Sequence, residues 1–119
     1  MLEGACHCGA VKVRYDGLPK AAVRCNCSIC RRLGVTWGHG PLGVITIIAN
    51  PDATRAYLCG DRSLAFHHCR TCGCTTHWLS QEGGDSRNAA INLNLVESPQ
   101  WADIPVRQFD GADTWRFTD

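Results

Sequence analysis

The chain has 119 residues, of which 45% are apolar and 19% are charged, a balance typical of a soluble globular protein. Twelve Lys and Arg against 11 Asp and Glu give a net charge of +1, which excludes a nucleic-acid binder that works by bulk positive charge. No stretch approaches the ~20 consecutive apolar residues of a membrane span, so we expect neither nucleic acid nor a membrane as a partner.

The length predicts a single domain over residues 1–119, built mostly from short strands. Alternating or β-branched runs predict strands, in chain order, over residues 10–15, 21–25, 44–49, 54–58, 64–68, 75–79 and 89–95. One short helix is expected over residues 28–33, with Ser28 as its N-terminal cap. Many short strands with glycine-rich turns predict a mainly β domain, either a sandwich or a barrel.

The last part of the chain adds two expectations. In the strand predicted over residues 89–95, leucine and isoleucine alternate with Asn92 and Asn94, which predicts one buried face and one solvated face. The tail over residues 98–119 holds four aromatic residues. We expect this tail to pack back onto the sheet, because aromatic side chains gain most from burial.

Nine cysteines are the unusual feature of the composition. Their odd number, and an N-terminus without the basic and apolar regions of a secretion signal, predict a reducing cytoplasmic location in place of a disulfide framework. Eight of them fall in three clusters, namely Cys6 and Cys8; Cys25, Cys27 and Cys30; and Cys69, Cys72 and Cys74. Buried free thiols are the competing interpretation, but they do not account for spacing that is typical of zinc ligands.

Counting ligands predicts two zinc ions. Cys6, Cys8, Cys69 and Cys72 complete one structural site of four thiolates. Cys25, Cys27 and Cys30 then form a second site with three protein ligands and an open position, as in catalytic zinc sites. Cys74 either closes the second site as its fourth ligand or takes no part in it. If residues 72–74 are extended, the Cys74 side chain leaves on the same face as Cys72 and could reach the second cluster.

Three motifs resemble the glutathione-dependent formaldehyde-activating enzyme family, whose domain is shared with centromere protein V. They are GACHCGAV at residues 4–11, CNCSICR at residues 25–31, and CRTCG at residues 69–73 preceded by Phe66. The resemblance covers residues 4–95 and implies a β-tent-like zinc-binding domain of short antiparallel strands with zinc knuckles. It also implies a structural zinc on Cys6, Cys8, Cys69 and Cys72 and a reactive zinc on Cys25, Cys27 and Cys30.

The function that the resemblance implies is a zinc-dependent carbon–sulfur lyase-like activity on a thiol adduct such as S-hydroxymethylglutathione. Glutathione or another small-molecule thiol is then the expected partner, and zinc holds the substrate thiolate. The alternative is a non-catalytic zinc module with a structural or protein-interaction role. A second site closed by Cys74 favours this alternative, because four thiolates leave no vacancy for a substrate.

Other side chains near the clusters have two interpretations each. Arg31, Arg32 and Arg70 could pair with the carboxylates of a glutathione-like substrate, although a solvated surface charge is the favoured interpretation. His77 is a candidate general base, but a half-buried imidazole beside Trp78 is favoured. Residues 38–41 are expected to form a loop, in which His39 could line a pocket beside the second cysteine cluster.

Overall fold

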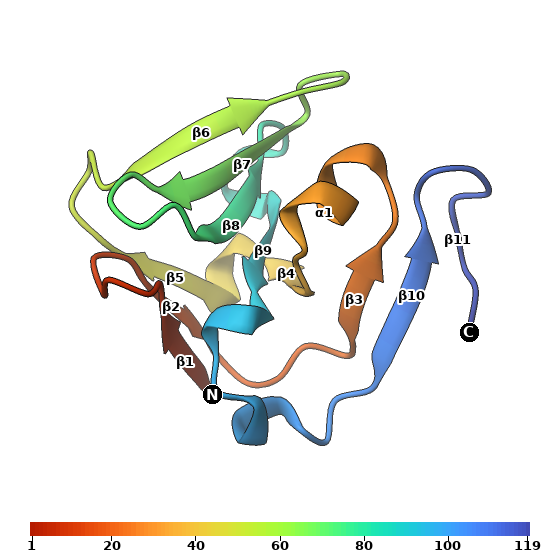
Figure 1. Cartoon of the computed structure of the whole chain (residues 1–119), viewed down its shortest axis with the longest axis horizontal. Coiled ribbons are helices and arrows are strands. Elements are labelled where there is room, and N and C mark those ends of the chain that lie inside the picture. The colour runs from red at the N-terminus through yellow and green to blue at the C-terminus, as the bar shows by residue number, and fades with distance from the viewer.

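The computed structural model describes residues 1–119, apart from the side chain at position 85. Within this described part, the strands form a three-stranded and an eight-stranded sheet (Figure 1). The small sheet has the order β1 (Leu2–Ala5), β2 (Lys12–Tyr15) and β5 (Ile45–Ile48), with antiparallel neighbours throughout. The large sheet has the order β11-β10-β3-β4-β9-β8-β7-β6. The predicted mainly β class is therefore confirmed.

Most predicted strands are present with nearly the predicted bounds. In the large sheet these are β3 (Ala22–Cys25), β6 (Thr54–Leu58), β7 (Leu64–Cys69), β8 (Thr75–Ser80) and β9 (Asn88–Asn92). Three strands of this sheet that local pattern did not predict are β4 (Trp37–Pro41), β10 (Val106–Asp110) and β11 (Arg116–Phe117). β4 occupies the segment expected to be a loop, because pairing with β3 and β9 orders a glycine-rich run of low strand propensity.

The prediction that one strand continues to residue 95 is wrong. β9 ends at Asn92, and Leu93–Leu95 form a 3₁₀ turn. The Asn92 side chain accepts the N–H of Asn94 over 3.1 Å and donates to the Thr75 carbonyl over 2.8 Å. Asn92 is thus buried, contrary to the predicted solvated face, because its amide satisfies backbone groups where the chain turns.

α1 (Ser28–Leu33) has the predicted bounds but a different cap. Cys27 is the N-cap residue, with extended backbone, and its sulfur accepts the N–H of Cys30 over 3.4 Å. Ser28 is already inside the helix, so its predicted capping role is wrong. Gly34 ends the helix in the left-handed conformation, with φ of 66°, which glycine adopts without strain.

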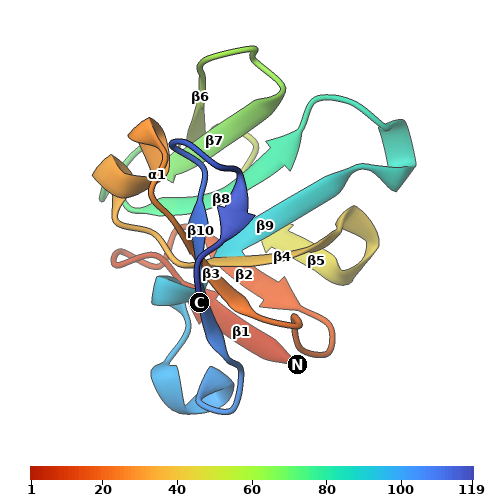
Figure 2. The same ribbon diagram turned by 90° about the vertical axis from the view of Figure 1, so that its right-hand side faces the viewer.

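The tail packs back onto the large sheet, as predicted. β10 pairs in parallel with β3, and Phe109 lies opposite Cys25 in the register. β11 (Arg116–Phe117) then folds back antiparallel to β10, with Phe109 opposite Phe117. Figure 2 shows β10 and β11 at the front of the molecule, beside β3 and near α1.

The core has two larger parts. The first lies between the sheets and includes Leu2 and Val13 from the small sheet and Ile91 from β9, which are almost fully buried. The second lies under α1 and contains Trp37, Phe66 and Trp78 from the large sheet. In the described part of the chain, the structure contains no helix long and apolar enough to cross a membrane.

Candidate functional site

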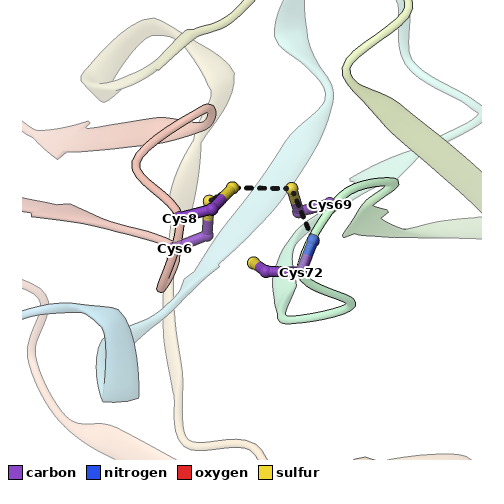
Figure 3. A group of neighbouring side chains, drawn as sticks. All are labelled: Cys6, Cys8, Cys69 and Cys72. Carbon is purple, nitrogen blue, oxygen red and sulfur yellow. Dashed lines mark hydrogen bonds between the residues drawn. The ribbon is translucent and has the colours of Figure 1, made fainter.

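Four cysteines meet where two loops face each other (Figure 3). One loop follows β1 and the other joins β7 to β8; the sulfurs, all within 4.8 Å of one another, belong to Cys6, Cys8, Cys69 and Cys72. The Cys8 sulfur lies 3.7 Å from that of Cys6 and 3.6 Å from that of Cys69, which is 61 positions away in the chain. This four-cysteine cluster joins the small sheet to the large sheet.

The geometry of the four-cysteine cluster fits a tetrahedral metal ion. Bonds of about 2.3 Å at tetrahedral angles place thiolates about 3.8 Å apart, close to the observed distances. The Val11 N–H donates to the Cys6 sulfur over 3.3 Å, and the Thr71 N–H donates to the Cys69 sulfur over 3.4 Å. Such donors stabilise the thiolate, which is the form that binds metal. The cluster could therefore hold a metal ion.

The protein by itself favours ionisation at one of these thiols and opposes it at another. The backbone N–H groups of Cys74 and Cys8 lower the pKa of Cys72 to about 5. At Cys8 the Ala10 N–H also acts to lower the pKa, but desolvation and neighbouring thiols outweigh it and raise the pKa to about 11. A cation bound by all four sulfurs would lower the raised pKa of Cys8, because it favours the thiolate form of each ligand.

Cys74 lies beside the four-cysteine cluster. Its thiol contacts Cys72, its carbonyl accepts the N–H of Cys69 over 2.9 Å, and it packs against the small core that contains Cys6. Gly73, with φ of 81°, turns the chain, so the segment is not extended and does not carry Cys74 to the second cluster. Among the described side chains, the Cys74 sulfur belongs to neither group of sulfurs within 4.8 Å.

A second group of cysteines converges at the start of α1. Cys25 ends β3, Cys27 caps the helix, and Cys30 is buried in its first turn. Their three sulfurs lie within 4.8 Å of one another and could also hold a metal ion. The helix cap creates this three-cysteine cluster, since the Cys30 N–H donates to the Cys27 sulfur and so draws the two side chains together.

The environment of the three-cysteine cluster favours a single thiolate when no cation is present. Burial raises the pKa of Cys30 to about 12, against the effect of the Trp37 indole N–H, which donates to its sulfur over 3.3 Å. Burial also raises the pKa of Cys25. At Cys27 burial acts in the same direction, but the N–H and thiol of Cys30 and other donors outweigh it, so its pKa is lowered. Three thiolates here need a compensating positive charge.

A cavity of about 400 Å³ opens beside the three-cysteine cluster. One wall is the aromatic core under α1, formed by Trp37, Phe66 and Trp78. The opposite wall comes from the tail and is also aromatic, with Phe109, Trp115 and Phe117. The volume lies in the range of pockets that hold small organic molecules. The geometry therefore joins a potential metal site to a predominantly apolar pocket.

The tail contacts the three-cysteine cluster through Gly111. Its N–H donates to the Cys25 sulfur, and a Cβ at this position would lie only 2.6 Å from that sulfur. Trp115 has φ of 60°, a left-handed conformation that costs a bulky residue on the order of 1–3 kcal/mol. Edge-on packing of Trp115 against Phe109, with ring centroids 5.1 Å apart, accompanies this conformation. The sequence analysis did not predict that these tail residues contact the three-cysteine cluster. The high proportion of aromatic residues in the tail was the available signal.

Comparison with known proteins supports the same reading of the motifs. A family model described as "Glutathione-dependent formaldehyde-activating enzyme" matches residues 1–109. The chain belongs to this family. A crystal structure of a Rhodobacter sphaeroides protein, a structural-genomics target, is similar with 29% sequence identity and a TM-score of 0.70, covering 88% of this chain and 99% of that one. No curated protein gives a significant match.

Some residues of the cavity wall lie outside the part of the chain that the family model matches. The matched part includes both cysteine clusters and Phe109, but Gly111, Trp115 and Phe117 lie beyond residue 109. The tail side of the cavity is therefore built partly by residues outside the matched range.

The histidines considered from sequence fall into different environments. His39 belongs to β4 and lines the cavity, with its ring centroid 5.6 Å from that of Trp78. The ring keeps contact with solvent, yet desolvation by its neighbours lowers its pKa. His77 is buried, stacks on His67 with centroids 4.4 Å apart, and hydrogen-bonds the Thr76 hydroxyl over 2.8 Å. His77 therefore has the environment of a structural imidazole.

The arginines considered as partners for carboxylates are exposed side chains. Arg31 and Arg32 lie on α1, and Arg32 donates to the Ser28 carbonyl over 2.9 Å. Arg70 lies in the loop of the four-cysteine cluster. Among the described residues that line the cavity, there is no arginine.

Proposed function

We propose that the protein is a zinc-dependent carbon–sulfur lyase of the formaldehyde-activating type, acting on the adduct of a thiol with formaldehyde, as in S-hydroxymethylglutathione. The observation that carries the proposal is the convergence of the Cys25, Cys27 and Cys30 sulfurs at the wall of a cavity of about 400 Å³. Membership of the family supports the reaction class.

Two zinc ions per chain are proposed, one in each cluster. The four-cysteine cluster, with Cys6, Cys8, Cys69 and Cys72, supplies a complete tetrahedral set and is assigned a structural role. The three-cysteine cluster supplies three ligands and is assigned the reactive role. An ion bound there supplies positive charge that keeps a substrate sulfur in the thiolate form.

The reaction breaks one carbon–sulfur bond. In R–S–CH₂–OH the bond breaks with its electron pair left on sulfur, the oxygen forms the double bond of formaldehyde, and the hydroxyl proton is released. His39 is our candidate to accept this proton, because its imidazole lines the same cavity and has a lowered pKa. In the reverse direction the thiolate attacks formaldehyde, and the same groups return the proton.

The chain's own donors orient the cysteine sulfurs for this work. Trp37 holds Cys30 through its indole N–H, and the Gly111 N–H holds Cys25. These two hydrogen bonds orient the sulfurs of Cys30 and Cys25, as hydrogen-bond donors around metal ligands do in other sites. The aromatic walls limit access of water to the reacting sulfur.

The alternative of a non-catalytic zinc module depends on a second site closed by a fourth thiolate. Cys74 packs beside Cys72, which belongs to the four-cysteine cluster. Because Cys74 is not at the three-cysteine cluster, this placement supports a fourth position there that a substrate can occupy. Among the described side chains, none of the nine cysteines is paired in a disulfide. We infer a reducing compartment such as the cytoplasm, because the proposed metal sites need reduced ligands.

The test compares the parent protein, Cys27→Ala and Cys59→Ala after purification without chelator. Metal content and formaldehyde release from hydroxymethyl adducts of several thiols are measured. Cys27→Ala is expected to lose one zinc per chain and all activity while keeping its fold, because the four-cysteine cluster is separate. Cys59, which stands in neither sulfur group, is the matched control and should keep both. Activity retained in Cys27→Ala would rule out the proposed reactive site.

A further inference from the structure

The cavity beside Cys25, Cys27 and Cys30 has the wrong polarity for a highly charged thiol. Glutathione carries two carboxylates and an ammonium group in addition to its thiol. The described lining residues include no lysine, arginine, aspartate or glutamate. Besides the cysteines, the ionisable side chain among these lining residues is His39, whose lowered pKa favours the neutral imidazole. Charged groups taken out of water need partners, and a neutral imidazole does not compensate two ionised carboxylates.

Two arginines near the cavity, Arg107 and Arg24, already have partners of their own. Arg107 touches a wall residue, since its guanidinium lies 3.9 Å from the centre of the Phe117 ring. Its Nε also pairs with the Asp119 carboxylate over 3.3 Å. Arg24 donates to the Thr36 hydroxyl over 3.3 Å. The charge of Arg107 is thus already matched, and Arg24 is already used to hold Thr36.

Aromatic rings face the cavity from two separate parts of the chain. Trp37, Phe66 and Trp78 are fixed in the core, with less than a tenth of each exposed. On the other side Trp115 is 71% exposed and Phe117 43% exposed, although both line the cavity. Exposed aromatic rings at a pocket edge are surfaces that a flat apolar ligand can cover.

The geometry points to a thiol substrate whose sulfur carries an uncharged aromatic group, held between the core rings and Trp115. This inference rests on the function proposed above and names the substituent of its thiol. Benzyl mercaptan is the simplest compound of this class. Its thiol reaches the three-cysteine cluster while its ring occupies the apolar space, so no charge is buried without a partner. Trp115 and Phe117, which supply the exposed rings of this pocket, lie beyond residue 109, where the family match ends.

The experiment measures binding by titration calorimetry to the full zinc-loaded chain, with three probes. Benzyl mercaptan and 4-(mercaptomethyl)benzoic acid share one ring and one thiol and differ by a carboxylate; the third probe is glutathione. Benzyl mercaptan is expected to bind at least about ten-fold more tightly than either charged probe, because of the cost of removing water from a carboxylate. Equal or tighter binding of the carboxylate analogue or of glutathione would overturn the inference.

Two variants test the position of the ring. Trp115→Ala removes a largely exposed side chain, and it is expected to weaken benzyl mercaptan binding by about five- to ten-fold while leaving glutathione binding unchanged. Tyr57→Ala is the matched control, because Tyr57 is 54% exposed and does not line this cavity. Both variants are first checked for parental zinc content. An unchanged affinity in Trp115→Ala contradicts the proposed placement of the ring.

Formaldehyde release from the adducts of the same thiols separates this inference from the function on which it rests. Selective benzyl mercaptan binding without release from any adduct supports the pocket's specificity and refutes the lyase. Release from S-hydroxymethylglutathione, with glutathione as the tighter ligand, supports the lyase and refutes the aromatic substrate. Absence of binding by all three thiols contradicts both.

Discussion

Gly111 shows at the scale of a single residue how the tail and the three-cysteine cluster depend on each other. Its backbone approaches so closely that a Cβ would lie 2.6 Å from the Cys25 sulfur and 3.2 Å from the Cys27 Cβ. A side chain is excluded here by proximity to proposed metal ligands, which cannot move aside without changing the site. The absence of a side chain is therefore a requirement of the site itself.

Gly111→Ala is predicted to weaken the proposed second zinc site by about 10–100-fold, because it displaces Cys25 or the N–H that holds it. Competition with a chromogenic chelator measures the affinity. Gly43→Ala is the control, since a Cβ at Gly43 meets nothing within 4 Å. A parental zinc affinity in Gly111→Ala would show that the tail does not support the cluster.

Cys72 carries the corresponding prediction for the four-cysteine cluster. Cys72→Ser is expected to lose one zinc and to lower the free energy of unfolding by at least about 4 kcal/mol, because structural zinc binding contributes directly to folding. Cys59→Ser makes the same chemical change outside both sulfur groups and should cost less than about 1 kcal/mol. Urea unfolding of both variants gives the comparison, and equal stabilities would contradict the structural role.

At the scale of elements, β7 and β8 are joined by a pair of stacked imidazoles. His67 and His77 lie opposite each other in the register, with rings 11° from parallel. Burial, and to a lesser extent the neighbouring His67, lowers the pKa of His77 to about 3. The strand pair is thus most stable when this imidazole is neutral.

The pH dependence of unfolding tests this pair. The unfolded chain binds a proton at His77 near pH 6.5, whereas the folded chain does not until about pH 3, so stability is lost as the pH falls through this window. Between pH 7.5 and 5.5 the parent should lose about 1 kcal/mol more than His77→Gln. The difference between the two proteins isolates His77 from metal release, which affects both. Parallel pH profiles would show that His77 does not titrate as described.

The elements also show where sequence reasoning succeeds. β6 and α1 were predicted with their observed bounds, because a β-branched, aromatic run and a short helical segment are local signals. β4 and β10 were missed, because Gly38 and Gly40 carry no strand propensity and β10 depends on a parallel partner about 80 positions away. The cap at Cys27 was also missed, since Ser28 is the commoner capping residue type.

At the scale of the whole molecule, the spacing of the cysteines predicted which sulfurs come together. The local sequence pattern did not predict the cavity. The pairs Cys6/Cys8 and Cys69/Cys72 are recognisable one by one, and ligand counting joins them. The cavity arises from rings on β4, β7, β8 and the tail, together with Val23 and Cys25 on β3, and their meeting depends on sheet order. Sheet order is a property of long-range pairing that no local motif records.

Stepwise metal removal gives a prediction at this scale. The zinc proposed for the three-cysteine cluster is expected to leave first, because it would have fewer protein ligands, and the fold should persist. Loss of the zinc proposed for the four-cysteine cluster should then expose β1 and β2 to hydrogen exchange, since this cluster joins their sheet to the large one. Metal release and exchange are followed together by mass spectrometry. Early loss of protection in β1 and β2, at one zinc per chain, contradicts this order.

The covering of Cys25 by Gly111 has a consequence for synthesis on the ribosome. Gly111 follows Cys30 by 81 positions. At about 5–20 residues per second, the cysteines are made roughly 4–16 s before the segment that covers them. A nascent chain therefore offers these thiols to cellular zinc while the site is still uncovered. In a finished chain Gly111 lies against Cys25, so an ion can approach these sulfurs only from the cavity side, and replacement is expected to be slower than first acquisition.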